Sequence, residues 1–289
     1  MRSIKLALFL VSISFFSFSA FSQEYQFELF KAYDSNGNQV KISDKVENIK
    51  SSDVVFFGEL HNQAVSHWLS LQILKLLPED GLAAGFEMFE TDQQIFLNEL
   101  SRGIIKAEKL KDVTHIWPNY ETDYAPLVNY CIENDIQLLA TNVPRRYASI
   151  TAKVGLDSLS KLEIPSIYLP QSNFDLPQDY VTYDQIKNMG GHGMNMEFFV
   201  QAQAIKDYTM ATIISNALNS GVKKVFHLNG SFHSTKFEGI VGFLTNINPD
   251  ISVFTVEVVI QDNLAELNEE NKGKADLIIV LPSDSPVTY

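Results

Sequence analysis

Two segments of the sequence place acidic or imidazole side chains directly after a run of apolar residues. In the first, Val54–His61, a glycine is followed by Glu59 and then by His61. In the second, Lys224–His233, a glycine is again followed three residues later by a histidine, His233. Carboxylates and imidazoles carry out general acid–base catalysis and also bind divalent metals. The repeated Gly-x-x-His spacing therefore predicts a chemically active site.

A third apolar segment, Leu82–Glu87, also ends on a carboxylate. Buried apolar runs of this length are typical of parallel strands, whose carboxyl ends meet at one edge of a sheet, where α/β proteins bind their ligands. A single polar residue at a strand end is usually a helix cap or a solvated group. We expect a functional cluster because several such residues converge: Glu59, His61, Glu87 and His233.

The chemistry of this cluster stays open at the level of the sequence. Two glutamates and two histidines can hold Mn, Fe, Co or Zn with one open position, or can act as a metal-free base in which a carboxylate orients an imidazole. A third interpretation is that the cluster only stabilises the strand ends. The sequence contains no His-Glu-x-x-His, no Gly-x-Ser-x-Gly and no Gly-x-Gly-x-x-Gly after the first strand.

The elements that must position these residues alternate between strand and helix. Helices are predicted over residues 62–77, 92–102, 196–219 and 235–246, and further strands over 136–140, 251–258 and 276–281. The segment 25–42 is predicted to be a small hairpin at the edge of the domain. The fold class is therefore α/β, a single domain with a central, mainly parallel sheet flanked by helices.

Other polar residues are assigned by their expected surroundings. His67 is predicted to lie on the face of its helix, outside the site. Gln203 and Asp207 share one side of a long helix, which by default faces solvent. Arg145, which follows a strand end at Asn142, is predicted to face an anion.

Composition and the first residues indicate an exported protein. The chain has 289 residues and a net charge of −13, which disfavours nucleic acid as a partner. Residues 1–22 have the basic start, apolar centre and small-residue end of a secretory signal, which leaves a domain of residues 23–289. We expect a periplasmic location. Lipid attachment is not supported, because no cysteine lies at the cleavage site, and Cys131 is predicted to pack in the core.

The chain resembles the ChaN family of haem-binding uptake proteins, in the superfamily that also includes erythromycin esterases and the Tiki and TraB proteases. The resemblance rests on an ordered set of motifs that covers most of the chain: residues 57–61, 85–90, 117–124, 142–145, 194–195, 203–211 and 230–233. Each motif is weak alone, but the set is specific.

The resemblance implies a cofactor, partners and site residues. It implies haem binding for iron uptake, with the iron held by a tyrosine, for which Tyr124 and Tyr120 are the candidates, and with His192 as a candidate for the propionates. Arg145, which is expected to face an anion, is a further candidate for binding the cofactor. It also implies a homodimer when haem is bound and an outer-membrane haem receptor as a partner. The hydrolytic relatives imply the alternative, a metal-dependent esterase or protease that uses Glu59, His61, Glu87 and His233.

Overall fold

The protein, seen here as a computed structural model, is described for residues 28–169, 174–189, 193 and 195–289. The predicted signal peptide and His192 lie outside the described residues. Within these residues eight strands form one sheet in the order β2-β1-β8-β7-β3-β6-β4-β5. The strand bounds are β1 Lys31–Asp34, β2 Gln39–Val40, β3 Val54–Glu59, β4 Leu82–Glu90, β5 Gln137–Asn142, β6 Lys224–Gly230, β7 Val253–Gln261 and β8 Leu277–Pro282.

The pairing of the strands confirms the predicted architecture. Strands β8, β7, β3, β6, β4 and β5 pair in parallel with one another in this order. Strand β1 pairs antiparallel with β2 and with β8, so the predicted hairpin forms the edge of the sheet. Its first strand begins at Lys31, later than predicted.

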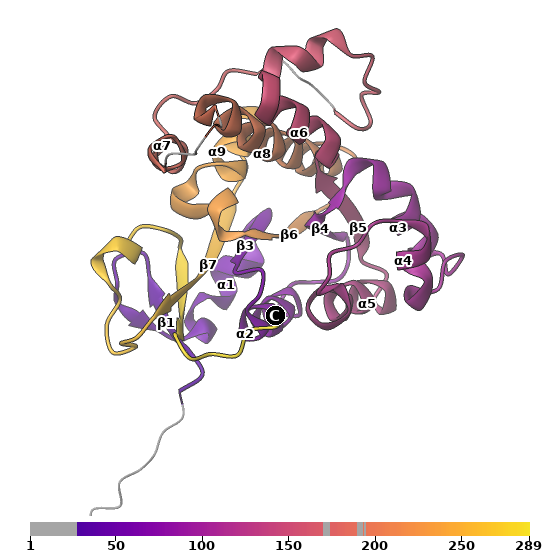
Figure 1. Cartoon of the computed structure of the whole chain (residues 1–289). Coiled ribbons are helices and arrows are strands. Elements are labelled where there is room, and N and C mark those ends of the chain that lie inside the picture. Colours follow the sequence, from indigo (N-terminus) through magenta and orange to yellow (C-terminus); the bar gives the residue numbers. More distant parts are fainter. Residues whose placement is uncertain (1–27, 170–173, 190–192, 194) are drawn as a thin grey trace, which may run out of the picture.

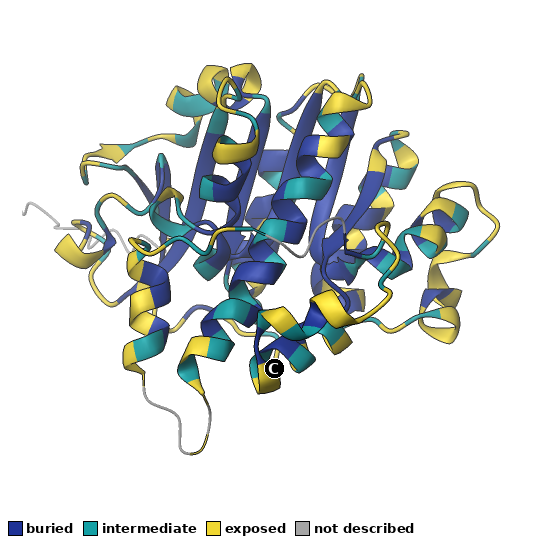
Figure 2. Ribbon diagram, turned by 90° about the horizontal axis from the view of Figure 1, so that it is seen from above, coloured by how far each residue is buried: buried dark blue, intermediate teal, exposed yellow. Residues whose placement is uncertain are grey.

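Strand β3 shows why the apolar runs are continuous. Val55 and Phe57 pack into the core on one face of the sheet, whereas Val54 and Phe56 pack on the other. Successive side chains of a strand point to opposite faces, so a strand covered on both sides buries every position, and in β3 apolar residues fill positions 54–57. Figure 2 shows the strands as a buried layer behind helices that expose only their outer faces.

Helices cover both faces of the sheet (Figure 1). On one face lie α1 Val46–Ser51, α2 Ala64–Leu74, α3 Gln94–Ser101, α4 Leu110–Val113 and α5 Ala125–Glu133, and on the other lie α6 Arg145–Val154, α7 Val181–Asn188, α8 Met196–Asn219 and α9 Ile240–Ile247. The side chain of Asn195 caps α8 by accepting hydrogen bonds from the amides of Glu197 and Phe198. No helix in the described part of the chain is long and apolar enough to cross a bilayer.

The segment after β6 differs from its prediction. A continuous helix over 235–246 is wrong, because α9 begins only at Ile240. The backbone φ angles of Lys236, Phe237 and Gly239 are +58°, +61° and +55°, which no right-handed helix contains. Short 3₁₀ turns at Ser231–His233 and Thr235–Phe237 fill this segment, and the first of them carries His233.

Candidate functional site

The carboxyl edge of the sheet brings the predicted side chains together. Glu59 ends β3 and lies in register with Gly230 at the end of β6, while Glu87 belongs to the adjacent β4. His61 and His233 follow β3 and β6 directly. Their side chains form two chains of ion pairs and hydrogen bonds, which we call the β3 chain and the β4 chain.

The β3 chain is centred on the Glu59 carboxylate, which is 1% exposed. Its Oε1 accepts a hydrogen bond from the Tyr124 hydroxyl at 2.8 Å and lies 2.8 Å from Nδ1 of His61. Burial alone would raise the pKa of Glu59, but its hydrogen bonds and ion pairs with the two histidines of the chain outweigh burial and lower it. Glu59 is thus an ionised acceptor that fixes the His61 ring.

His67 is the second imidazole of the β3 chain. Its Nδ1 lies 2.7 Å from Oε2 of Glu59, and its Nε2 lies 3.5 Å from Oδ2 of Asp123. The prediction that His67 lies outside the site is wrong, since its helix α2 turns this side toward the sheet and leaves the residue 3% exposed. Helical spacing was the available signal, because His67 shares a stripe with the buried Ser70 and Leu74.

The β4 chain is closed at both nitrogens of its histidine. His233 Nε2 lies 3.2 Å from Oε1 of Glu87, and His233 Nδ1 lies 2.5 Å from Oδ1 of Asp207. The Tyr183 hydroxyl donates to the other Asp207 oxygen at 2.7 Å, and the Gly230 amide donates to Oε2 of Glu87 at 2.7 Å. Asp207 is 0% exposed, so the expectation that its side of α8 faces solvent is wrong.

The two carboxylates determine the charge of His233. Burial alone would lower its pKa, but the charges of Glu87 and Asp207 raise the pKa to about 10. His233 is therefore an imidazolium at neutral pH. In turn, the pKa of the buried Glu87 carboxyl lies below its usual value, because the charge of His233 outweighs the effect of burial.

Gly230 lets the two chains meet. A Cβ at this position would lie 2.8 Å from Cε1 and Nε2 of His61 and 3.5 Å from Oε2 of Glu87. The His61 ring therefore packs against the backbone of β6, next to Glu87. This contact explains why a glycine precedes the second histidine: any side chain there would displace the first one.

This geometry does not fit the divalent-metal site predicted for Glu59, His61, Glu87 and His233. Both nitrogens of His233 and both oxygens of Glu87 already have partners within the protein. The described residues include no group of three or more His, Cys, Asp or Glu side chains arranged to hold a metal ion. The four side chains converge as predicted, but as ion pairs.

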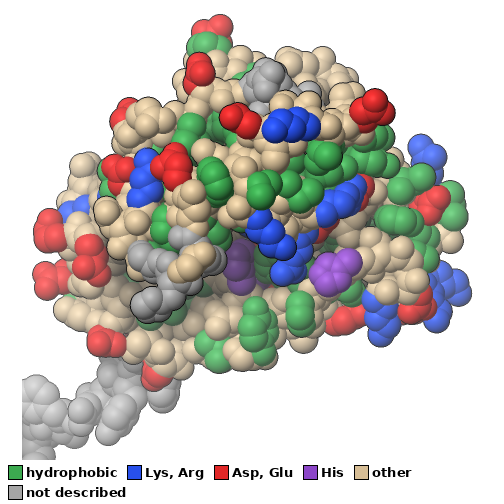
Figure 3. All heavy atoms as spheres, turned by 45° about the horizontal axis from the view of Figure 1, so that its top comes forward, with side chains coloured by type: hydrophobic (Ala, Val, Ile, Leu, Met, Phe, Trp, Pro, Cys, Tyr) green, Lys and Arg blue, Asp and Glu red, His purple; other side chains and the backbone are tan. Residues whose placement is uncertain are grey.

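A hollow of about 500 Å³ opens above the two chains. His61, Glu87 and His233 line it together with apolar side chains, among them Trp117, Val143, Ala148, Ala152, Phe199 and Ala202. Arg145, Lys206 and His115 supply basic or imidazole groups. Figure 3 shows this hollowed face, with histidine, Lys and Arg side chains around the opening. Apolar walls with a few polar groups are typical of a small-molecule site.

The two candidate tyrosines do not reach this hollow. Tyr124 is 0% exposed and donates to Glu59, whereas Tyr120 is 2% exposed and packs edge-on against Phe89. Burial raises the pKa of both hydroxyls, which opposes the tyrosinate form that binds ferric iron. Both lie in a turn of π-helix, Tyr120–Tyr124, that directs them inward. Their placement contradicts a direct contact with a ligand in the hollow, which Arg145 does line.

Two further side chains were not predicted as part of the site. Asn119 donates from Nδ2 to the carbonyl of His61 at 2.8 Å and to Oδ2 of Asp123 at 2.6 Å. Their segment is rich in aromatic and polar residues, but its irregular backbone gives no periodicity from which their direction could be predicted.

Comparison with known proteins identifies the family of the chain. Residues 45–244 match the family described as haem-binding uptake, Tiki superfamily, ChaN. A curated relative from Arabidopsis thaliana, Protein RETICULATA-RELATED 5, chloroplastic, is 23% identical over 192 residues, which are 61% of this chain and 26% of the relative. The chain thus spans about a quarter of that relative's length.

A solved structure of the same family shares the fold, and a second one gives a lower score. The ChaN protein of Campylobacter jejuni, solved with cofacial haem, superposes with a TM-score of 0.65 at 18% identity and covers 87% of this chain and 96% of its own. A mutant of the erythromycin esterase EreC in its open conformation gives a TM-score of 0.45 at 14% identity, over 76% of this chain and 72% of its own. The family match covers most of the described chain and confirms the resemblance: the chain belongs to the ChaN family of haem-binding uptake proteins in the Tiki superfamily.

Proposed function

We propose that this protein binds haem in the hollow at the carboxyl edge of the sheet and serves haem or iron uptake. Family membership supports haem as the ligand. The single observation that carries the location is the hollow itself, which combines apolar walls, basic groups and the partly exposed imidazole of His61 in about 500 Å³. Haem requires these features because it joins a flat apolar ring, two carboxylates and an iron that needs an axial ligand.

His61 is the proposed iron ligand. Its side chain is 40% exposed, and its Nδ1 is held by Glu59, so Nε2 remains for an incoming iron. An imidazole that ligates a metal commonly donates its other N–H to a carboxylate, which fixes the ring and raises its basicity. Histidine replaces the tyrosine implied by the resemblance, because none of the described residues that line the hollow is a tyrosine.

The propionates are assigned to the basic groups of the hollow. Arg145 begins α6 and Lys206 lies in α8, so the two cations reach the hollow from different helices. A guanidinium binds a carboxylate through two parallel hydrogen bonds, whereas an ammonium acts as a point charge. We propose that Arg145 holds a propionate and that Lys206 assists it. His192 remains a candidate for this role, although it lies outside the described residues.

The proposal extends to assembly and location. The solved ChaN protein of Campylobacter jejuni binds haem cofacially, that is, with haem faces opposed. We propose that two copies of the present chain likewise pair when haem is bound, with their hollows facing each other. The predicted signal of residues 1–22 supports a periplasmic location. An outer-membrane haem receptor is then the expected partner in uptake.

A haemin titration tests the proposal. Purified protein should show saturable binding and an imidazole-type absorption spectrum, and sedimentation should detect a haem-dependent dimer. His61→Gln should abolish that spectrum, whereas His115→Gln, a second histidine of the same hollow, is the matched control and should retain it. Unsaturable haemin uptake, equal in the wild type and in His61→Gln, would reject the hollow as a haem site.

A hydrolase is the second candidate function. The Glu59–His61 pair is a carboxylate-oriented imidazole that faces a hollow, which is the arrangement of a general base. Turnover of p-nitrophenyl esters or of peptides that is lost in His61→Gln and retained in His115→Gln would support this function. Equal background rates for the wild type and for His61→Gln would remove it.

A further inference from the structure

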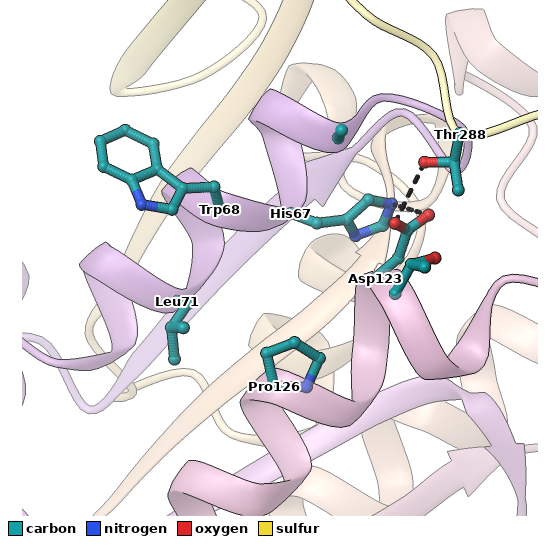
Figure 4. Close-up of a pocket in the computed structure, with 8 residues that line it drawn as sticks. His67, Trp68, Leu71, Asp123, Pro126 and Thr288 are labelled. Carbon is teal, nitrogen blue, oxygen red and sulfur yellow. Dashed lines mark hydrogen bonds and ion pairs between the residues drawn. The ribbon is translucent and has the colours of Figure 1, made fainter.

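His67 connects the site to a second hollow between α2 and the start of α5. This hollow has a volume of about 380 Å³ and is lined by Ala64, His67, Trp68, Leu71, Thr122, Asp123, Pro126 and Thr288. Figure 4 shows His67, Asp123 and Thr288 gathered at one end, with Trp68, Leu71 and Pro126 forming the apolar side. We infer that His67 is a positioning residue for His61, and that the C-terminal segment takes part through Thr288 and Asp123.

His67 supports His61 at two points. Its Nδ1 lies 2.7 Å from Oε2 of Glu59, while the other oxygen of that carboxylate lies 2.8 Å from Nδ1 of His61. Its Nε2 lies 3.2 Å from the carbonyl oxygen of His61 itself. One imidazole thus contacts both the backbone of His61 and the carboxylate that orients the His61 ring. Without it, Oε2 of Glu59 would be buried without a partner, and the carboxylate would be held through Oε1 alone.

Asp123 holds His67 in turn. Its Oδ2 lies 3.5 Å from Nε2 of His67 and accepts a hydrogen bond from Asn119 at 2.6 Å. Its Oδ1 accepts a hydrogen bond from the hydroxyl of Thr288 at 3.0 Å. The segments that hold His67, Asn119 and Asp123 also contact the carbonyl of His61 or the Glu59 carboxylate. Thr288 lies outside these segments. The network therefore ends at the C-terminal segment.

The C-terminal segment is fixed on the chain directly after His61. The amide of Thr288 donates to the carbonyl of Asn62 at 2.8 Å, and Val287 forms a bridge with Gln63. The hydroxyl of Ser285 donates to Oε1 of Gln63 at 3.0 Å. These contacts hold the turn between β3 and α2, so a disturbance of residues 285–288 is transmitted to His61 through both the backbone and Asp123.

The inference rests on the proposed function only for the identity of the ligand. The first readout therefore uses ligand-free protein: the nuclear Overhauser effect between the rings of His61 and Trp117, whose centroids are 4.9 Å apart. The second readout is haemin affinity. If haemin does not bind but the substitutions still weaken the ring contact, the proposed function fails and the inference stands. If the substitutions leave the ring contact as in the wild type, the inference fails.

The variants distinguish a loss of His61 positioning from a loss of the folded structure. His67→Phe keeps a ring but removes both nitrogens; we expect it to lose the ring contact and to weaken haemin binding by about tenfold or more, the usual effect of removing a partner behind a metal ligand. His67→Asn retains a donor near the Nδ1 position and should restore most of both. Trp68→Phe, in the same hollow but without a contact to Glu59, is the matched control and should match the wild type.

Asp123→Asn and Thr288→Val extend the test to the C-terminal segment and keep it informative if His67→Phe does not fold. Both should weaken the ring contact in the same direction, with the smaller effect for Thr288→Val. Wild-type ring contacts and wild-type haemin affinity in Asp123→Asn, and in His67→Phe if that variant folds, would overturn the inference.

Discussion

The β3 chain and the β4 chain begin with the same Gly-x-x-His signal but end differently. In the β3 chain the His61 side chain is 40% exposed, and within the described part of the protein only its Nδ1 has a hydrogen-bond partner. In the β4 chain the His233 side chain is 7% exposed, and each of its two ring nitrogens forms an ion pair with a carboxylate. The first chain presents an imidazole to the hollow, whereas the second holds a buried cation next to it.

The difference comes from the helices that cover the two faces. Helix α8 brings Asp207 against Nδ1 of His233 and so closes the β4 chain. Helix α2 brings His67 against Glu59 and the carbonyl of His61, behind the ring, so the β3 chain stays open toward the hollow. The repeated Gly-x-x-His motif thus places a histidine after each strand, and the partners of that histidine determine its charge and its exposure.

Removing His233 should have the largest effect on the free energy of unfolding. His233→Ala leaves Glu87 and Asp207 buried without their shared cation, which we expect to cost about 3–5 kcal/mol of unfolding free energy. His61→Ala should cost less than half as much, because its ring is partly solvated. Urea unfolding at pH 7 measures both. Equal losses would mean that the two chains do not differ in the way described.

The pH dependence of stability should separate the chains next. The pKa of His233 is raised to about 10, so its contribution is fully present below about pH 6.5 and is lost as the pH rises through about 10. We expect the wild type to lose on the order of 3 kcal/mol relative to His233→Ala between these limits. Unfolding curves measured at several pH values test this, and a constant difference between the two proteins would contradict it.

Two glycine substitutions probe the surroundings of each histidine. Gly239 has a φ of +55°, and a Cβ there would lie 2.4 Å from the carbonyl oxygen of His233, so Gly239→Ala should cost on the order of 3 kcal/mol. Gly230→Ala would instead press on the partly exposed ring of His61, which can move. We expect it to cost about 1 kcal/mol and to weaken haemin binding. Thermal unfolding and haemin titration distinguish the two, and a reversed order of stability losses would be evidence against the difference.

The smallest expected effect is that of Tyr124→Phe. The substitution removes one hydrogen bond to Glu59 and should cost about 1 kcal/mol of stability. Because the hydroxyl is buried behind the β3 chain, the haemin spectrum should stay as in the wild type. Loss of the haem charge-transfer bands in this variant would return the iron to the tyrosine.

The sequence was sufficient for the strands and for the residues at their ends. A strand buried on both faces is mostly apolar, so the polar residues that follow Gly58 and Gly230 stand out, and parallel pairing brings them to one edge. The partners behind them could not be placed in this way. His67 and Asp207 lie in helices, and the rotation of a helix against a sheet depends on packing that neither residue type reveals.

The tyrosines show a second limit. Tyr124 and Tyr120 lie in a π-helical turn, which shifts the direction of side chains relative to an α-helix and has no clear sequence pattern. Their aromatic, partly polar segment is equally compatible with a ligand-facing loop, which the family resemblance favoured. The structure directs both hydroxyls inward, so His61, and neither tyrosine, is the proposed iron ligand.

A crystal structure of the haemin complex tests the central claim most directly. We predict haem in the hollow above the two chains, with its iron bonded to Nε2 of His61, a propionate on Arg145, and the His233 ring still between Glu87 and Asp207. Haem bound elsewhere on the chain, or iron held by a tyrosine while His61 remains free, would contradict this assignment.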